Sequence, residues 1–354
     1  MRLVESEAGE WRAGDVRAVP RKASDVRVTE LAEGIIGLRL PLPYPPPAPA
    51  SVNCYLLAGR EGHTLIDAGS SLAPGWEALE RALLKAKVQP AAIRTLVLTH
   101  MHSDHAGGTA AVVENSGCEV ARLAGPDTAN DAFRDARAPL EERHAVSLRE
   151  GVPSVELPWW TETNLADDGH HPHVEPDRLL AEDDVVRTAA GDWRVVPAPG
   201  HSPTQIALVE ERSRWVLSAD LAYGRGTPFL EFGHSPDPVE EHLGSLERVE
   251  RLEPELLLPG HGRPAQSPLG VLARARNATL AACARVRAEL SAEPRSAYEL
   301  AFPRVSAERN ANRRQEILAL TATVLAHFER QGDVVAEVGA DGVRRVRPTA
   351  PGDQ

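Results

Sequence analysis

The chain has 354 residues, enough for two domains of about 100–200 residues each, and its 42% hydrophobic and 25% charged residues are typical of a soluble globular protein. No stretch reaches the roughly 18 consecutive apolar residues that a membrane span requires. Residues 1–21 also lack the apolar segment of a signal peptide, so we expect a cytoplasmic protein without membrane contact.

The charge is unevenly distributed along the chain. The formal net charge is −12, whereas residues 271–354 contain 13 arginines, no lysine and 10 acidic residues, which gives +3 there and −15 for the remainder. An acidic body repels phosphate backbones at long range, which disfavours a nucleic-acid substrate without excluding it. Cys54, Cys118 and Cys283 are odd in number and far apart, so we expect reduced, mostly buried cysteines.

The first part of the chain alternates predicted strands with predicted helices. Apolar and β-branched residues predict strands at residues 26–28, 35–38, 51–57, 63–67, 93–98 and 120–123, and helical spacing predicts helices at 72–87 and 108–114. The proline-rich segment 41–49 cannot be a central strand. It either borders the substrate or is a plain surface connection.

The loop after the strand at 93–98 holds three imidazoles and a carboxylate within six residues: His100, His102, Asp104 and His105. Divalent cations such as zinc take histidine nitrogens and carboxylate oxygens as ligands. A spacing of two on extended chain aims His100 and His102 the same way, while Asp104 and His105 turn toward a second point. One short loop can therefore serve two metals.

Four more polar residues follow apolar runs further along the chain. They are Asp67, His201, Asp220 and His261. With the H-x-H-x-D-H loop, this order resembles the metallo-β-lactamase superfamily over about residues 30–265. The resemblance implies an α+β fold, an αββα sandwich whose strand ends converge on one edge.

Carried over position by position, the resemblance also implies two metal sites. His100, His102 and His201 would hold the first metal, and Asp104, His105 and His261 the second. Asp220 would bridge both, and Asp67 would orient the ligands by accepting a hydrogen bond. Because residues 105 and 261 are histidines, the set resembles the glyoxalase II type rather than the β-lactamases that use a cysteine at the second metal.

An insertion at about residues 125–180 distinguishes this chain. Helical patterns at 129–138 and 140–150 precede Trp159 and Trp160, then a polar turn with His170, His171 and His173, which we expect to be solvated. In the superfamily such an insertion usually forms a lid or pocket wall. Trp159 or Trp160 either contacts an apolar part of the substrate or belongs to the core, and Tyr223 either reaches the pocket or only packs.

The C-terminal part has its own pattern, and we expect domains at 1–268 and 269–354. One helix is predicted at 237–252, before this boundary. After the boundary, helices are predicted at 269–290, at the capping box of Ser296 and Glu299, and at 310–330, followed by a β-hairpin at 333–346. Three helices and a hairpin resemble the small winged helix found in a superfamily branch that includes β-lactamase-like endoribonucleases. The hairpin carries three arginines, Arg344, Arg345 and Arg347. They either bind phosphates or lie on a solvated wing that packs against the body or against a second subunit of a homodimer.

The metal chemistry implies the reaction. Two cations about 3.5–4 Å apart lower the pKa of a bridging water from 15.7 to about 7, which supplies hydroxide at neutral pH. Asp104 and Asp220 would offset charge and orient this nucleophile. Zinc is the default metal for these ligands, and iron or manganese suits the same set. We find no serine or cysteine in a nucleophile-elbow context.

The sequence leaves more than one class of substrate open. The all-histidine second site and the acidic body favour an acyl carbonyl, a thioester first and then a lactone or other ester of a small molecule. The alternative is an endoribonuclease cleaving single-stranded RNA, argued by analogy with the tail. A third alternative is a non-catalytic metal-binding scaffold, which we disfavour because such a scaffold does not need a complete set of metal ligands. β-Lactam hydrolysis, as a side activity, is a less favoured alternative.

Overall fold

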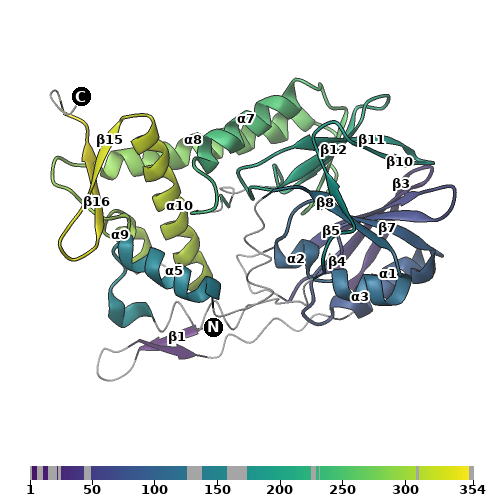
Figure 1. The fold of residues 1–354 in the computed structure, drawn as a ribbon, viewed down its shortest axis with the longest axis horizontal. Helices are drawn as coiled ribbons and strands as arrows, with labels where there is room; N and C mark the ends of the chain where they lie inside the picture. Colours follow the sequence, from purple (N-terminus) through teal and green to yellow (C-terminus); the bar gives the residue numbers. More distant parts are fainter. Residues whose placement is uncertain are drawn as a thin grey trace.

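A seven-stranded sheet forms one half of a two-sheet sandwich in the computed structural model (Figure 1). The structure describes residues 2–5, 11–14, 22, 25–43, 49–125, 138–157, 174–224, 229–230, 232–307 and 311–350. In sheet order the strands of the seven-stranded sheet are β3 (Arg27–Ala32), β4 (Ile35–Pro41), β5 (Ser51–Ala58), β6 (His63–Ile66), β7 (Ile93–Leu98), β8 (Glu119–Leu123) and β9 (Arg178–Leu180). Neighbouring strands are antiparallel from β3 to β6 and parallel from β6 to β9.

A five-stranded sheet faces the first across an apolar interior. Its strands are β10 (Val185–Thr188), β11 (Gly191–Pro197), β12 (Ile206–Glu210), β13 (Trp215–Ala219) and β14 (Leu256–Pro259), antiparallel except for the β13–β14 pair. Trp193, Leu57 and Val97 are among the buried side chains that fill the space between the sheets. Because the outer faces of the sheets are covered as well, central strands such as β5 and β12 are buried on both faces and nearly all along their length.

Helices cover the outer face of each sheet. α1 (Gly75–Lys85) and α3 (Thr109–Ser116) pack on the seven-stranded sheet, and α7 (Pro238–Glu250) with the first turns of α8 (Pro268–Glu289) on the five-stranded sheet. α7 begins where the Asp237 carboxylate accepts the Glu240 N–H at 3.0 Å. The predicted αββα sandwich is therefore confirmed.

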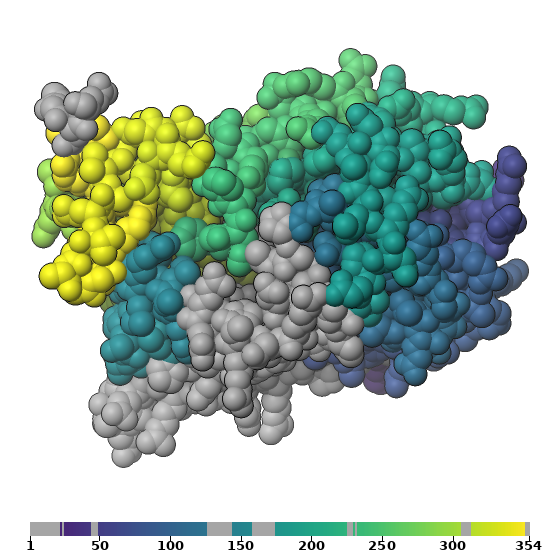
Figure 2. Space-filling view, viewed as in Figure 1, coloured from purple at the N-terminus to yellow at the C-terminus, as the bar shows by residue number. Residues whose placement is uncertain are grey.

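The C-terminal residues form a second apolar core, which Val152 and Leu157 also enter. α9 (Ala297–Ala307), α10 (Ala311–Arg330) and the antiparallel pair β15 (Val334–Val338) and β16 (Arg344–Pro348) surround it. Figure 2 shows these residues, in yellow, against α5 (Ala138–Arg149). α8 connects the two parts, since Val271 and Leu272 lie in the outer layer of the sandwich and Val286 lies in the C-terminal core. The winged-helix likeness and the boundary at 268/269 stay predictions.

Local signals in the C-terminal part form as the sequence predicts. The Ser296 N–H donates to the Glu299 carboxylate at 2.7 Å, and the Glu299 N–H donates to Ser296 Oγ at 3.2 Å, which completes the capping box. Cys54, Cys118 and Cys283 are free thiols. In the described part of the chain, no helix is long and apolar enough to cross a membrane.

Other predictions need correction or lie outside the described residues. Asp104 and His105 belong to a four-residue helix, α2 (Ser103–Ala106), where we expected a loop. The sequence pattern did not predict the antiparallel pair of β1 (Arg2–Glu5) and β2 (Trp11–Gly14), or the 3₁₀ turns η2 (Pro90–Ala92) and η3 (Ser154–Glu156). The predictions that fall outside the described residues concern Trp159, Trp160, His170, His171, His173 and most of the helix at 129–138.

Candidate metal centre

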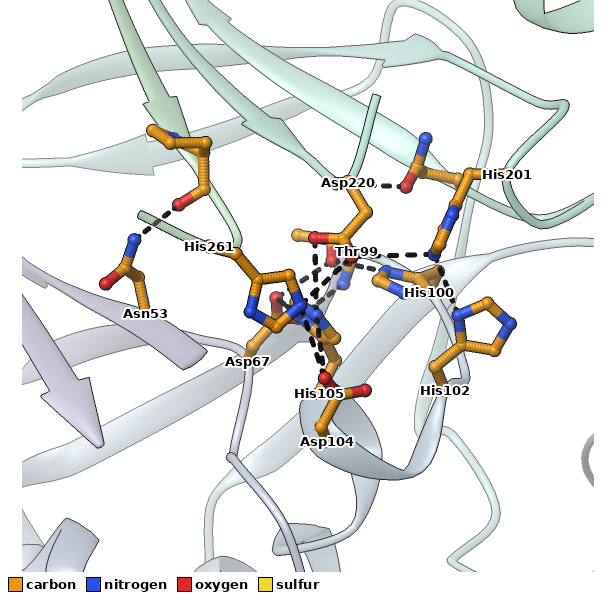
Figure 3. Close-up of polar contacts among 12 residues, drawn as sticks. Asn53, Asp67, Thr99, His100, His102, Asp104, His105, His201, Asp220 and His261 are labelled. Atoms are coloured by element: carbon orange, nitrogen blue, oxygen red, sulfur yellow. Dashed lines mark hydrogen bonds and ion pairs between the residues drawn. The ribbon is translucent and has the colours of Figure 1, made fainter. Parts of the chain in front are cut away.

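Seven predicted ligands meet at one edge of the sandwich (Figure 3). Four come from the β7–α2 segment, and the other three from the turns that follow β11, β13 and β14. β7 lies beside β6 in one sheet and β14 beside β13 in the other, both parallel pairs, so their carboxyl ends reach the same edge. These residues are His100, His102, Asp104, His105, His201, Asp220 and His261.

The first group of ligands consists of His100, His102 and His201. The offered atoms lie within 4.8 Å of one another, and His102 Nδ1 is 2.8 Å from His201 Nε2. His201 Nδ1 donates to the Phe229 carbonyl at 2.9 Å, and His100 Nδ1 lies 3.0 Å from Thr99 Oγ1. These contacts leave the Nε2 atoms of His100 and His201 as acceptors that point into the centre.

The second group consists of Asp104, His105 and His261. His261 Nε2 lies 3.2 Å and His105 Nε2 3.9 Å from Asp104 Oδ2. The Nδ1 atom of His261 donates to the Ser51 carbonyl at 2.8 Å, which directs Nε2 toward the centre and makes it the atom that a cation would take in place of a proton. A fixed tautomer of this kind is what a metal-binding imidazole needs.

The Asp220 carboxylate lies between the two groups. Its Oδ2 is 3.6 Å from His201 Nε2 in the first group and 3.1 Å from His261 Nε2 in the second, and Oδ1 is 3.4 Å from His105 Nε2. No other carboxylate in the described part of the chain lies within ion-pair distance of both groups. Asp220 is therefore placed within reach of both groups of ligands, and its bridging of two metals stays a prediction.

Asp67 lies behind the centre and contacts no other predicted ligand than His105. Its Oδ2 accepts from His105 Nδ1 at 2.8 Å and from Thr99 Oγ1 at 2.9 Å, and its Oδ1 accepts from the Thr99 N–H at 2.8 Å. The backbone of Asp67 has φ = 61°, a conformation that aspartate tolerates better than most residues. Asp67 thus hydrogen-bonds His105 and connects the strand ends of β6 and β7.

The two groups differ in electrostatics. Burial and neighbouring imidazoles lower the pKa of His201 to about 4 and the pKa of His100 well below its usual value, so both rings stay neutral. Burial opposes ionisation of His261 as well, but the carboxylates of Asp220 and Asp104 raise its pKa to about 10. The second group therefore attracts positive charge, in the form of a proton or of a cation.

The buried polar atoms of these residues fit divalent cations, and this evidence comes from the structure itself rather than from related proteins. His100 Nε2, His105 Nε2 and Asp220 Oδ1 are buried without a hydrogen-bond partner in the described part of the chain, which is costly for polar atoms. Two ligands held at about 2.0–2.1 Å from one zinc ion lie about 2.8–3.4 Å apart. The separations between His102 and His201, 2.8 Å, and between Asp220 and His261, 3.1 Å, fall in this range.

Comparisons with known proteins agree with this geometry. The sequence profile of the metallo-β-lactamase superfamily matches residues 47–261, which contain all seven ligands. The chain belongs to the metallo-β-lactamase superfamily. The fold of this superfamily member also resembles a metallo-β-lactamase family protein from Thermus thermophilus, with a TM-score of 0.76 and 23% identity over 90% of this chain and 100% of that one.

Curated relatives of this superfamily member include several hydrolases. A probable metallo-hydrolase of Bacillus subtilis is 26% identical over 77% of this chain and 86% of its own length. An acyl-coenzyme A thioesterase of Gallus gallus is 30% identical over 59% of this chain and 72% of its own. A hydroxyacylglutathione hydrolase of Bdellovibrio bacteriovorus is 24% identical over 47% of each.

The metallo-β-lactamase centre opens into a pocket of about 920 Å³. Asp220 and His261 line it at one end, together with Tyr223, whose ring lies 5.0 Å from the ring of His261. Phe229, which the sequence pattern did not single out, lines the same region and contacts the rings of His102 and His201 edge to face at 5.7 and 5.9 Å. Aromatic rings therefore flank both halves of the centre.

Buried polar residues of β5 hold the His261 turn and were also missed. Asn53 Nδ2 and Tyr55 Oη donate to the Pro259 carbonyl at 2.8 and 2.7 Å, and the Asn53 N–H donates to the Gly260 carbonyl at 2.7 Å. A Cβ at Gly260 would lie 2.1 Å from Asp220 Oδ1, so only glycine fits there. The available signal was an asparagine inside an otherwise apolar strand.

Proposed function

We propose that this chain is a dinuclear metal-dependent hydrolase that cleaves acyl thioesters with water. The observation that carries the proposal is the position of an all-histidine and aspartate centre at the end of a pocket of small-molecule size with apolar and aromatic walls. The names of relatives that act on thioesters, the acyl-coenzyme A thioesterase and the hydroxyacylglutathione hydrolase, support this substrate class.

The residues would divide between two cations. His100, His102 and His201 would hold one and Asp104, His105 and His261 the other, with the Asp220 carboxylate shared. When bound, such a pair of cations lowers the pKa of water and stabilises negative charge on the carbonyl oxygen. Zinc is our first expectation for this donor set, with iron or manganese as alternatives.

The protein's own groups would position water and substrate. Asp104 and Asp220 remain ionised, because the neighbouring His105 and His261 hold their pKa values below the usual range although burial acts in the opposite direction. Their oxygens would therefore accept hydrogen bonds from the attacking water. Burial and Asp220 raise the pKa of Tyr223 well above its ordinary value, so this hydroxyl keeps its proton and would donate to the substrate.

A thioester suits the remaining chemistry. The leaving thiol has a pKa near about 8.5, so it departs as an anion without a strong general acid. Phe229 is 38% exposed beside the first group of ligands and would exclude water from the acyl chain.

Two of the three hairpin arginines, Arg344 and Arg345, give the RNA-cleavage alternative little support. Arg344 contacts Glu329 at 2.5 Å and Glu150 at 3.5 Å, and Arg345 contacts Asp341 at 2.7 Å. Guanidinium groups paired in this way have less positive charge to offer to a phosphate backbone.

The proposal is tested by measuring thiol release from a panel of acyl thioesters with the zinc-loaded protein. We expect release that a chelator abolishes and that Asp220→Asn reduces by about 100-fold or more, because removal of one electrostatic group at such a site commonly costs about 10²–10³ in rate. Asp192→Asn, an exposed position on β11, is the matched control. If no thioester is cleaved, or if Asp220→Asn keeps full activity, the proposal is wrong.

A further inference from the structure

The pocket continues from the metal centre along one face of α8. Val271, Arg274, Ala275, Ala278 and Arg285 line it. Their spacing is that of a single helical face. Val271 lies in the outer layer of the sandwich, whereas Val286, next to Arg285, lies in the C-terminal core. The pocket therefore extends from the metal centre to the C-terminal helices, where α10 supplies its opposite wall.

The walls of this extension are rich in positive charge. Arg274 and Arg285 come from α8, Arg313 from α10 and Arg39 from β4, whereas Glu316 is the one acidic residue besides Asp220 among the described lining residues. Arg313 contacts Glu316 at 2.7 Å, and Arg39 donates to Asn53 Oδ1 at 3.3 Å.

Arg274 and Arg285 are the uncompensated members of this set. Neither has a hydrogen bond or an ion pair within the part of the chain that the structure describes. Two other arginines of the same helix are compensated, since Arg276 contacts Glu250 at 2.6 Å and Arg287 contacts Asp333. Burial and the nearby charge of Arg285 lower the pKa of Arg304, although Glu289 acts in the opposite direction.

We propose that Arg274 and Arg285, with Arg313 on the facing helix, bind the phosphate groups of the thiol portion of the substrate. The substrate would then be a thioester of a phosphorylated carrier thiol, of the coenzyme A kind. Arg285 follows Arg274 by eleven positions, which places their Cα atoms about 16.5 Å apart along the helix axis. An extended ligand with more than one anionic group would therefore contact both arginines, and this assignment rests on the proposed thioester hydrolysis.

The charge of the rest of the protein makes this assignment specific. Residues 1–270 carry a net charge of −15, so an anionic substrate is repelled from the body as a whole. Guanidinium groups bind phosphates through two parallel hydrogen bonds, and they do so most strongly where no carboxylate competes. Only a site with locally uncompensated arginines would hold a phosphorylated ligand on this surface.

The first test measures binding without catalysis. Coenzyme A and N-acetylcysteamine share the same thiol end, so the difference in their affinity for the zinc-loaded full chain, measured by calorimetry, reports the contribution of the phosphates. We expect coenzyme A to bind about 100-fold more tightly than N-acetylcysteamine, or more. Arg274→Gln with Arg285→Gln should reduce this ratio at least tenfold, and the Arg→Lys pair should keep part of it.

The second test compares hydrolysis of one acyl group on the two thiols. The double glutamine variant should lower the preference for the coenzyme A ester at least tenfold, mainly through a higher KM. Arg251→Gln, which removes an exposed charge at the end of α7, should keep the preference. An unchanged melting temperature would show that the variant remains folded.

The two proposals fail in different ways. Hydrolysis of both esters with no preference, or a preference that the arginine variants keep, would overturn the phosphate site and leave thioester hydrolysis standing. Loss of activity only on carboxylated acyl groups, or only of single-stranded RNA binding, would assign the arginines to another ligand and also overturn it. Tight binding of coenzyme A that depends on the arginines, without any thioester cleavage, would support the site and refute the proposed reaction.

Discussion

Asp67→Asn tests how the residue behind the metal centre controls it. Asparagine has nearly the same shape and also tolerates a positive φ, so the substitution leaves the backbone turn intact. The amide can keep its oxygen toward the Thr99 N–H, but its NH₂ group then faces His105 Nδ1, where a carboxylate oxygen now accepts at 2.8 Å. His105 would have to move its proton to Nε2, the atom that faces the centre.

The size of the effect follows from these contacts. Loss of one buried hydrogen bond to a charged group should lower the free energy of unfolding by about 1.5–3 kcal/mol. Residues that orient a metal-bound histidine typically contribute about 10–100-fold to metal affinity, so the site that contains His105 should bind its cation weaker by about 1.4–2.7 kcal/mol.

The assay combines denaturant unfolding of the metal-free protein with zinc titration. Asp177→Asn is the matched control, because Asp177 accepts one backbone N–H, from Val120 at 2.9 Å, far from the centre, and asparagine keeps that acceptor. If Asp67→Asn bound two zinc ions with wild-type affinity, the inference that Asp67 sets the tautomer of His105 would be refuted.

Two further predictions concern packing and pH. Gly260→Ala should abolish activity and destabilise the protein by about 1–3 kcal/mol, because the added Cβ would overlap Asp220 Oδ1 and His105 Cε1. Gly244→Ala is the control: this position on α7 has open space around it, so the variant should keep activity and raise the melting temperature. Equal behaviour of the two variants would contradict the close packing at the centre. For the metal-free protein, the folded pKa of His261, about 10, exceeds its ordinary value of 6.5, so this stabilisation is full below pH 6.5 and is lost as the pH rises through 10. Melting temperatures measured from about pH 6 to 10 should fall, and the fall should be smaller in His261→Gln; a wild-type curve that rises in this window would contradict the sign.

The sequence predicted the parts of the centre that depend on local order. The strand at 93–98 begins and ends where β7 does, and each ligand follows an apolar run because strand ends carry the side chains to one edge. The capping box at Ser296 and Glu299 forms as expected, since it needs only a fixed spacing of three residues.

The rest depends on contacts between residues far apart in the chain. Asn53 holds a carbonyl 206 residues away, and no local pattern announces such a pair. On α7, His242 is fully buried although the helical pattern does not single it out, because Gly200 lets the helix backbone approach closely there. The arginines of the pocket come from β4, α8 and α10, and only the fold brings them to one wall.

The most direct test of the central account is the number of metal ions that each chain binds. We predict two zinc ions per wild-type chain, measured by elemental analysis after dialysis. His102→Ala and His261→Ala should each retain one, in different groups of ligands, and Asp220→Asn should weaken both. One zinc ion per wild-type chain, or two ions retained in His261→Ala, would contradict the two-site centre.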